Sequence, residues 1–292
     1  MDADANGTTL CLNCSTALTG PYCPNCGQRH DPKIHTFAHF ATEAFENITH
    51  ADSRLWRTLW ILISKPGQLT QEFFDGRRMR YLPPVRFYLV VSLAFFLLAG
   101  AISERSDSFV KVDVADKEIP AKGNAARELT GCDGIKYDGP FKVTVMALLP
   151  LQCRKILADN GRGLVRAVFA NFPRALFAFL PLLAAFMMLL YWRPRRYYVE
   201  HLLLLLHNHI FLFIGYGLLL LCELALPASS AVGLIGFIFH IYLAWYFYRG
   251  MRVVYGQGRA LSLTKYILLA TAYMAAAVVT LFLVFAFSAA AL

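Results

Sequence analysis

Charged side chains are scarce in this sequence, and acidic side chains are the scarcest. Only 16% of the 292 residues are Asp, Glu, Lys or Arg, whereas soluble globular domains average about 25%. Hydrophobic residues make up 57% of the chain, and its mean hydropathy is +0.47. An ordinary soluble domain is therefore excluded, because part of this apolar surface has to face lipid.

Further absences narrow the class of protein. The first ten residues, MDADANGTTL, lack the basic and then apolar pattern of a cleavable signal peptide, so we expect the first apolar span to act as the insertion signal. The chain has no internal repeat and no low-complexity tract. Its net charge is +9, but Lys and Arg cluster beside apolar runs and form no basic soluble face. A nucleic-acid partner is therefore not expected.

Five apolar runs are long enough to cross a bilayer, which takes about 20 residues in a helix. They cover residues 85–102, 175–192, 198–226, 231–248 and 266–292. The sequence therefore predicts an all-α fold, a polytopic helical membrane protein with about five transmembrane helices, and membrane lipids as its surroundings.

The basic residues beside the spans predict the orientation, since cytoplasmic loops retain Lys and Arg. One cluster precedes the first span, one separates the second span from the third, and one separates the fourth from the fifth, so all three fall on one side. The clusters are Arg77, Arg78, Arg80 and Arg86; Arg193, Arg195 and Arg196; and Arg249, Arg252, Arg259 and Lys265. We expect a bacterial inner-membrane protein with a cytoplasmic N-terminus and an external C-terminus.

Residues 103–166 form the one long region on the external side. The first half has no apolar period and is predicted to be a loop, and residues 141–157 are predicted to lie on the membrane surface as an amphipathic stretch interrupted by Pro150. Cys132 and Cys153 lie in this region, where an oxidising compartment permits a disulfide or leaves two free thiols.

Two Cys-x-x-Cys pairs lie close together near the N-terminus, at Cys11 and Cys14 and at Cys23 and Cys26. Tetrahedral zinc needs four soft donors, and each pair presents two thiolates that converge on one point. Gly27 suits a tight turn with positive φ after the second pair. The twinned spacing favours a structural zinc ion, with redox disulfides or free thiols as the alternative.

The segment between the four cysteines and the first span is predicted to contain two amphipathic helices. The first is indicated by apolar residues at helical spacing over 37–48, and the second covers 53–64 with Trp56 and Trp60 one turn apart, which suits a helix at the headgroup level. The sequence thus divides into a zinc-ribbon knuckle at 1–30, cytoplasmic amphipathic or interfacial helices at 31–84, and a transmembrane domain at 85–292.

Ionisable side chains cluster in the third and fourth spans, where each is costly and marks a site or a packing contact. The cluster comprises Glu200, His201, His207, His209 and His240, with Tyr216 and Tyr242 as weaker polar partners. His207 and His209 point about 160° apart on a helix, so a shared metal centre would need residues from other helices. One interpretation is hydrogen bonding between helices; the other is a polar path for chemistry or transport.

Basic residues also precede the first span, where they suit contact with anionic lipid headgroups as well as simple anchoring on the inner side. These residues are Arg77, Arg78, Arg80 and Arg86.

Several short motifs together resemble a known family. They are the first Cys-x-x-Cys pair, residues 22–28 (YCPNCGQ), Lys65-Pro66-Gly67, Gly76-Arg77-Arg78 with Tyr81 and Pro84, Tyr198-Val199-Glu200-His201, and Val254-Tyr255-Gly256. The chain resembles a widespread bacterial family of uncharacterised membrane proteins with an N-terminal zinc ribbon. The resemblance implies an architecture and no established activity.

Two functions follow as hypotheses. The first is a non-enzymatic membrane protein, with a role in envelope regulation or assembly, whose zinc knuckle docks a cytoplasmic protein partner or stabilises the membrane-surface helices. The second is an intramembrane enzyme, or a transporter of a lipid or small solute, that uses the His and Glu residues of the third and fourth spans.

Overall fold

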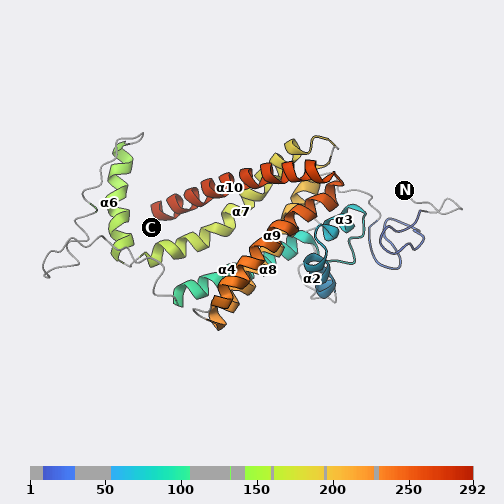
Figure 1. Ribbon diagram of the computed structural model, residues 1–292, viewed down its shortest axis with the longest axis horizontal. Helices are drawn as coiled ribbons and strands as arrows, with labels where there is room; N and C mark the ends of the chain where they lie inside the picture. The colour runs from blue at the N-terminus through green and yellow to red at the C-terminus, as the bar shows by residue number, and fades with distance from the viewer. Residues whose placement is uncertain are drawn as a thin grey trace. The chain divides into compact units, whose positions relative to one another are not determined.

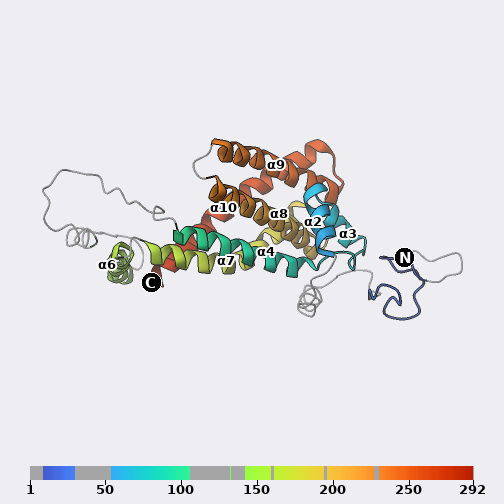
Figure 2. The same cartoon turned by 90° about the horizontal axis from the view of Figure 1, so that it is seen from below.

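The computed structural model describes residues 9–29, 54–105, 132, 142–158, 161–193, 196–226 and 230–291. Eight α-helices lie within these ranges (Figures 1 and 2). They are α2 (Arg54–Ser64), α3 (Gln68–Phe74), α4 (Pro84–Arg105), α6 (Lys142–Ala158), α7 (Arg162–Leu190), α8 (Tyr198–Ala225), α9 (Ser230–Tyr255) and α10 (Arg259–Ala290). The described residues contain isolated β-bridges but no named strand. The helix predicted over 37–48 lies outside the described residues.

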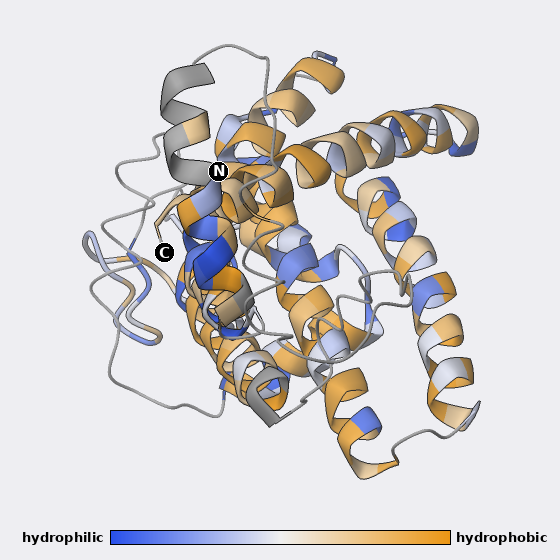
Figure 3. Ribbon diagram, turned by 90° about the vertical axis from the view of Figure 1, so that its left-hand side faces the viewer, coloured by the Kyte–Doolittle hydropathy of each residue, from blue (hydrophilic) through white to orange (hydrophobic). Residues whose placement is uncertain are grey.

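Five of the described helices are long and apolar enough to span a membrane, which confirms the predicted fold class of a multi-pass helical membrane protein. These are α4, α7, α8, α9 and α10, and apolar residues cover most of their length (Figure 3). Their bounds differ from the apolar runs. α7 begins at Arg162 and α10 at Arg259, well before residues 175 and 266, and α9 continues through the basic residues to Tyr255. α4 and α7 therefore both reach into the stretch 103–166, which was predicted as one long region between the first two spans.

The chain divides into two compact units, and α4, α7 and α10 contribute residues to both. The first unit holds residues 1–95 and 178–274, and the second holds residues 96–177 and 275–292. The first unit contains the cysteine knuckle and the helices α2, α3, α8 and α9. The contacts among these elements therefore lie within one unit.

α8 forms the core of the first unit. In the most apolar 18-residue stretch of α8, 61% of the residues are buried, whereas only 6% are buried in the corresponding stretches of α9 and α10. α8 packs against α9, α3 and α2, and α3 also packs against α9. The polar residues in the first half of α8 are therefore buried against protein, while most of the α9 surface is exposed. The buried polar residues are His201, His207, Asn208 and His209.

α2 and α3 form a short hairpin that packs against α8 and α9 (Figures 1 and 2). α2 confirms the predicted helix that ends before Lys65-Pro66-Gly67, whereas α3 was not predicted. Gly67 is the N-cap of α3 and has a φ of 79°, in the left-handed region that glycine adopts without strain. The turn therefore reverses the chain at the place where the hairpin touches α9.

In the second unit, residues 142–158 form one continuous helix, α6, that runs through Pro150. The prediction that Pro150 interrupts this stretch was wrong. Cys132 and Cys153 form a disulfide, which decides between the two alternatives left open for these thiols. Asn171 of α7 donates to the Ser288 hydroxyl of α10 (3.1 Å).

Candidate functional site

The two Cys-x-x-Cys segments fold in the same way. In the first, the Ser15 amide donates to the Cys11 carbonyl (2.8 Å), and in the second the Gly27 amide donates to the Cys23 carbonyl (3.0 Å). The residue after each second cysteine has positive φ, 59° at Ser15 and 70° at Gly27. This confirms the turn predicted at Gly27. Each tight turn aims two sulfurs toward the same point.

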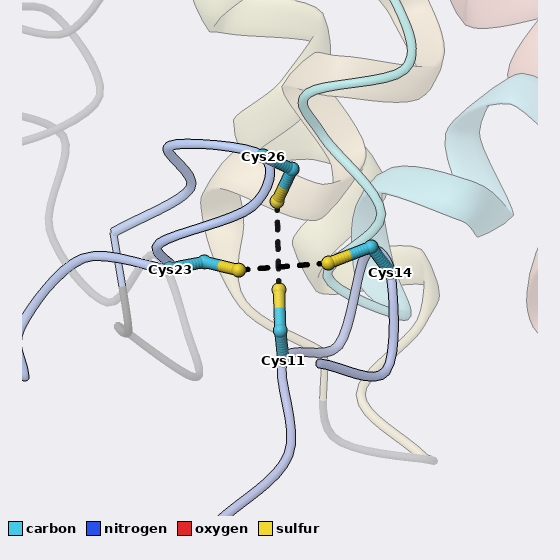
Figure 4. Close-up of side chains that lie close together, drawn as sticks. All are labelled: Cys11, Cys14, Cys23 and Cys26. Atoms are coloured by element: carbon cyan, nitrogen blue, oxygen red, sulfur yellow. Dashed lines mark hydrogen bonds between the residues drawn. The ribbon is translucent and has the colours of Figure 1, made fainter. Parts of the chain in front are cut away.

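The four sulfurs meet at one centre (Figure 4). The Sγ atoms of Cys11 and Cys26 are 3.6 Å apart, those of Cys14 and Cys23 are 3.5 Å apart, and all four lie within 4.8 Å of one another. Tetrahedral zinc with Zn–S bonds of about 2.3 Å requires sulfurs about 3.8 Å apart. The four cysteines therefore fit one metal ion of this kind, and with four thiolates no coordination position remains for water or substrate.

The surroundings of the sulfurs differ between two of these cysteines. The hydrogen bond between Cys14 Sγ and Thr16 Oγ1 (3.3 Å) lowers the pKa of the Cys14 thiol to about 6, whereas burial raises the pKa of Cys11 to about 12. Asn25, in the second Cys-x-x-Cys turn, donates to the same Thr16 hydroxyl (3.2 Å) and thereby joins the two turns. A bound cation stabilises the thiolate form of both cysteines.

The knuckle also bonds to the chain segment between α3 and α4. Gln28 Nε2 donates to the Gly76 carbonyl (2.6 Å), and Arg80 donates to the Asn13 carbonyl (2.6 Å). The Leu12 side chain lies over Gly76, where an added Cβ would stand 2.7 Å from Leu12 Cδ1. The first Cys-x-x-Cys turn thus faces this segment, which we call the docking segment (residues 76–80).

Two arginines predicted to contact lipid headgroups have protein partners here. Arg77 binds Glu72 through two hydrogen bonds (2.6 and 3.0 Å) and Asp75 through a third (2.7 Å), while Arg80 holds the knuckle. The hydrogen bonds from Arg77 lower the pKa of Glu72 below its usual range. Arg77 and Arg80 therefore fix the docking segment.

The histidines of the predicted polar cluster bind separate partners. His207 Nδ1 pairs with the Thr70 hydroxyl of α3 (2.8 Å), and His209 pairs with the Tyr273 hydroxyl of α10 (3.1 Å) and with the Leu205 carbonyl. The two side chains leave α8 toward different helices, as their spacing predicts. Among the described residues, the four cysteines are the only group of His, Cys, Asp or Glu side chains placed to hold a metal ion.

Glu200 and His201 lie in a second polar group at the start of α8. Glu200 closes the helix start by accepting from the Tyr197 amide (3.0 Å) and lies 3.7 Å from Arg196. His201 is fully buried, and its Nδ1 pairs with the Tyr255 hydroxyl at the end of α9 (2.6 Å). The structure thus brings together the two motifs around His201 and Tyr255, which stand 54 residues apart.

His240 differs from the other histidines of the cluster in being exposed. Its Nε2 pairs with the Tyr216 hydroxyl (3.0 Å) and its Nδ1 with the Gly236 carbonyl, and the pair is exposed on the outer surface of α8 and α9. Tyr242 instead donates to the Ile63 carbonyl of α2 (3.1 Å). The predicted residues therefore form separate pairs and share no single site.

Sequence reasoning missed the partners Thr70, Tyr255 and Tyr273. Tyr255 belongs to the motif Val254-Tyr255-Gly256, and that motif was the one feature of the sequence that could have pointed to it. Thr70 lies 137 residues from His207 and Tyr273 lies 64 residues from His209, and no local pattern joins residues so far apart.

Residues 52–96 match the sequence family described as "Protein of unknown function (DUF3667)". The matched segment contains α2, α3, the docking segment and the first part of α4. The match agrees with the predicted resemblance to an uncharacterised family. No curated protein and no solved structure matches the chain.

Proposed function

We propose that this chain is a non-enzymatic protein of the bacterial inner membrane, in which a structural zinc ion folds the knuckle so that it holds the docking segment. The observation that carries the proposal is the pair of bonds that join them, from Gln28 to the Gly76 carbonyl and from Arg80 to the Asn13 carbonyl. A site closed by four thiolates supports a structural role for the metal.

Metal binding and docking are coupled in this proposal. Asn13 lies between Cys11 and Cys14, and Gln28 follows Cys26 by two residues, so the two cysteine turns set the positions of both docking groups. A segment of 21 described residues has too small an apolar core to hold these turns alone, and the metal supplies the folding free energy. Loss of the metal would therefore release the docking segment.

The second Cys-x-x-Cys turn supports a partner-binding role. Pro21, Tyr22 and Pro24 are exposed, and the Tyr22 side chain is 60% exposed. These exposed side chains take no part in the bonds to the docking segment, so a cytoplasmic protein partner can reach them while the knuckle stays docked. The proposed domains are the knuckle at 1–30, the membrane-surface helices at 31–84 and the membrane domain at 85–292.

The two kinds of cysteine support the proposed orientation. The four knuckle thiols are free, whereas Cys132 and Cys153 form a disulfide, and one candidate span, α4, separates the two groups along the chain. Free thiols persist in a reducing cytoplasm and disulfides form outside it. This agrees with a cytoplasmic N-terminus and an external C-terminus, as the basic clusters also predict.

A second candidate function is an intramembrane enzyme or a transporter of a lipid or small solute. One observation favours it: the Nε2 atoms of the buried His201 and His207 have no hydrogen-bond partner in the structure. The separate pairing of His207 and His209 instead supports hydrogen bonding between helices, which needs no enzymatic or transport role.

Hydrogen exchange on the purified full-length protein tests the coupling of metal and docking. We expect a zinc chelator to speed exchange of the backbone amides at 76–82. Arg80→Ala should do the same without loss of zinc, since Arg80 is no metal ligand. Tyr22→Ala is the matched control on the exposed turn and should leave both exchange and zinc content unchanged. Purified protein without zinc, or exchange at 76–82 that chelation leaves unchanged, would overturn the proposal.

A further inference from the structure

The short helix α2 has two different faces. Thr58, Ile61 and Leu62 are buried, whereas Trp56 and Trp60 are 76% and 71% exposed. Ile63 is also exposed. At about 100° per residue, Trp56, Trp60 and Ile63 fall within an arc of about 60°, so they form one apolar stripe. Two tryptophans held in water on one stripe are unfavourable, and something apolar is needed to cover them.

The C-terminal end of α2 is bonded to α9. Tyr246 donates to the Leu62 carbonyl (2.6 Å) and Tyr242 donates to the Ile63 carbonyl (3.1 Å). The last carbonyls of a helix have no partner within the helix, and water satisfies them when the end is exposed. Partners supplied by protein are what such an end needs in an apolar medium, where unpaired carbonyls cost several kcal/mol each.

These bonds place the end of α2 beside the apolar part of α9. Tyr246 and Tyr242 lie about 14 Å and about 20 Å along the helix from its end at Tyr255. Gly67, just past α2, touches Gly250. The tip of the hairpin therefore lies at the basic end of α9, while the last residues of α2 lie beside the apolar part of that span.

The stripe on α2 continues onto the exposed face of α9. Tyr242, which bonds to Ile63, also packs against Trp245, with ring centroids 5.4 Å apart, and both Trp245 and Ile241 are exposed. α9 is a candidate span with 6% of its most apolar stretch buried, so lipid covers this face. The same lipid is the nearest apolar medium for the stripe on α2.

Polar groups flank the stripe on one side. Arg57 and Ser64 are exposed and lie about 60–100° from its centre, while Lys65 follows at the exposed tip. A helix with tryptophans on one face and basic residues beside them is typical of one that lies at the membrane surface. The charges then remain at the level of the phosphates while the aromatic rings enter the bilayer.

We infer that α2 and α3 form a hairpin inserted into one leaflet of a phospholipid bilayer without crossing it, with Trp56, Trp60 and Ile63 in contact with acyl chains. Among the described helices, the hairpin adds a membrane-embedded element to the five candidate spans. It rests on the membrane-spanning role of α9 and needs neither the zinc ion nor the knuckle.

Fluorescence quenching of the full chain in vesicles tests the inference. The vesicles contain phosphatidylcholine and phosphatidylglycerol, with or without bromine near the glycerol end of the acyl chains. The sequence has four tryptophans, at 56, 60, 192 and 245, so Trp192→Phe with Trp245→Phe leaves those of α2. We expect brominated lipid to lower their emission by about half or more, since an interfacial helix sits about 5–10 Å deep, and aqueous iodide to have little effect.

Other occupants of the stripe give other results, and each overturns the inference. Strong quenching by iodide would place the stripe in water. Weak quenching by both agents, together with chemical crosslinks between chains through α2, would assign the stripe to a second copy of the protein. If the double variant does not fold, a second variant gives the quenching of Trp56 and Trp60 by subtraction. In it, Trp56 and Trp60 are replaced by Phe in the otherwise unchanged protein, and the loss of bromolipid quenching is measured.

Discussion

Gly67 in the turn before α3 lies against Gly250 of α9, so closely that a Cβ on Gly67 would stand 2.7 Å from the Gly250 carbonyl oxygen. Gly67 also has a φ of 79°. Two independent costs therefore oppose any side chain at this position, backbone strain of about 1–3 kcal/mol and a clash that pushes the hairpin away from α9.

Gly67→Ala should destabilise the protein by about 2 kcal/mol or more, which lowers the midpoint of thermal unfolding by about 4–8 °C. The midpoint is measured by intrinsic fluorescence in detergent. Gly258→Ala is the control, because an added Cβ at Gly258 meets no atom within 4 Å and its φ is not positive. Equal midpoints for the two variants would contradict the tight packing of the hairpin.

The four-cysteine centre predicts one zinc ion per chain. Cys23→Ser removes one thiolate and should reduce the bound zinc to well under half an ion per chain, because structural zinc sites lose most of their affinity with an incomplete ligand set. Metal content is measured by mass spectrometry on the purified protein. Cys222→Ser, in α8 and outside the cluster, should retain all of the metal. Full zinc occupancy in Cys23→Ser would exclude this centre as the site.

The ion pair between Glu72 and Arg77 predicts a dependence of stability on pH. Because the pKa of Glu72 in the folded protein lies below the ordinary value of 4.5, the ionised carboxylate adds stability above pH 4.5. That stability is lost as the pH falls through the lowered pKa. Glu72→Gln should therefore cost about 1 kcal/mol at pH 7, where the pair is partly exposed and screened, and much less in strong acid.

Thermal unfolding of the protein and of Glu72→Gln is compared at pH 7 and near pH 3. Asp75→Asn is the matched comparison, since the more exposed Asp75 also binds Arg77 and should have a smaller effect. A Glu72→Gln deficit that stays constant over this pH range would show that the carboxylate charge is not its cause.

The Thr70–His207 pair separates packing from chemistry in α8. A double-mutant cycle with Thr70→Val and His207→Leu should give a coupling energy of about 0.6–1.7 kcal/mol, as for hydrogen bonds between membrane helices. Tyr216 and His240, an exposed pair, serve as the comparison and should couple more weakly. If His207→Leu leaves the thermal midpoint unchanged but abolishes a cellular phenotype of the gene, the packing interpretation fails.

Apolar runs predicted the number of spans because lipid selects for length and hydropathy, which are local properties. They did not predict where the helices end. α7 starts at Arg162 and α9 continues to Tyr255, since helical hydrogen bonds continue into water after the apolar stretch stops. The cysteine cluster was equally predictable, because all four ligands lie within 16 residues and their spacing determines the turns.

The partners of the buried histidines were not predictable in this way. His207 offered only its residue type and its depth, while Thr70 is an unremarkable residue in a short helix that carries no long apolar run. A contact of this kind depends on the tertiary packing of α3 on α8. The docking of the knuckle is a similar case. The sequence indicates only that Arg80 belongs to a basic cluster beside a span, because its bond to Asn13 forms only in the folded chain.

The hydrogen bond from Tyr246 to the Leu62 carbonyl joins residues 184 positions apart in the chain. At ribosomal rates of about 5–20 residues per second, α2 leaves the ribosome about 10–40 s before the helix that caps it has been synthesised. Membrane insertion therefore proceeds with one of the first helices unfinished, and the nascent protein acquires its final hairpin only when the fourth span arrives beside it.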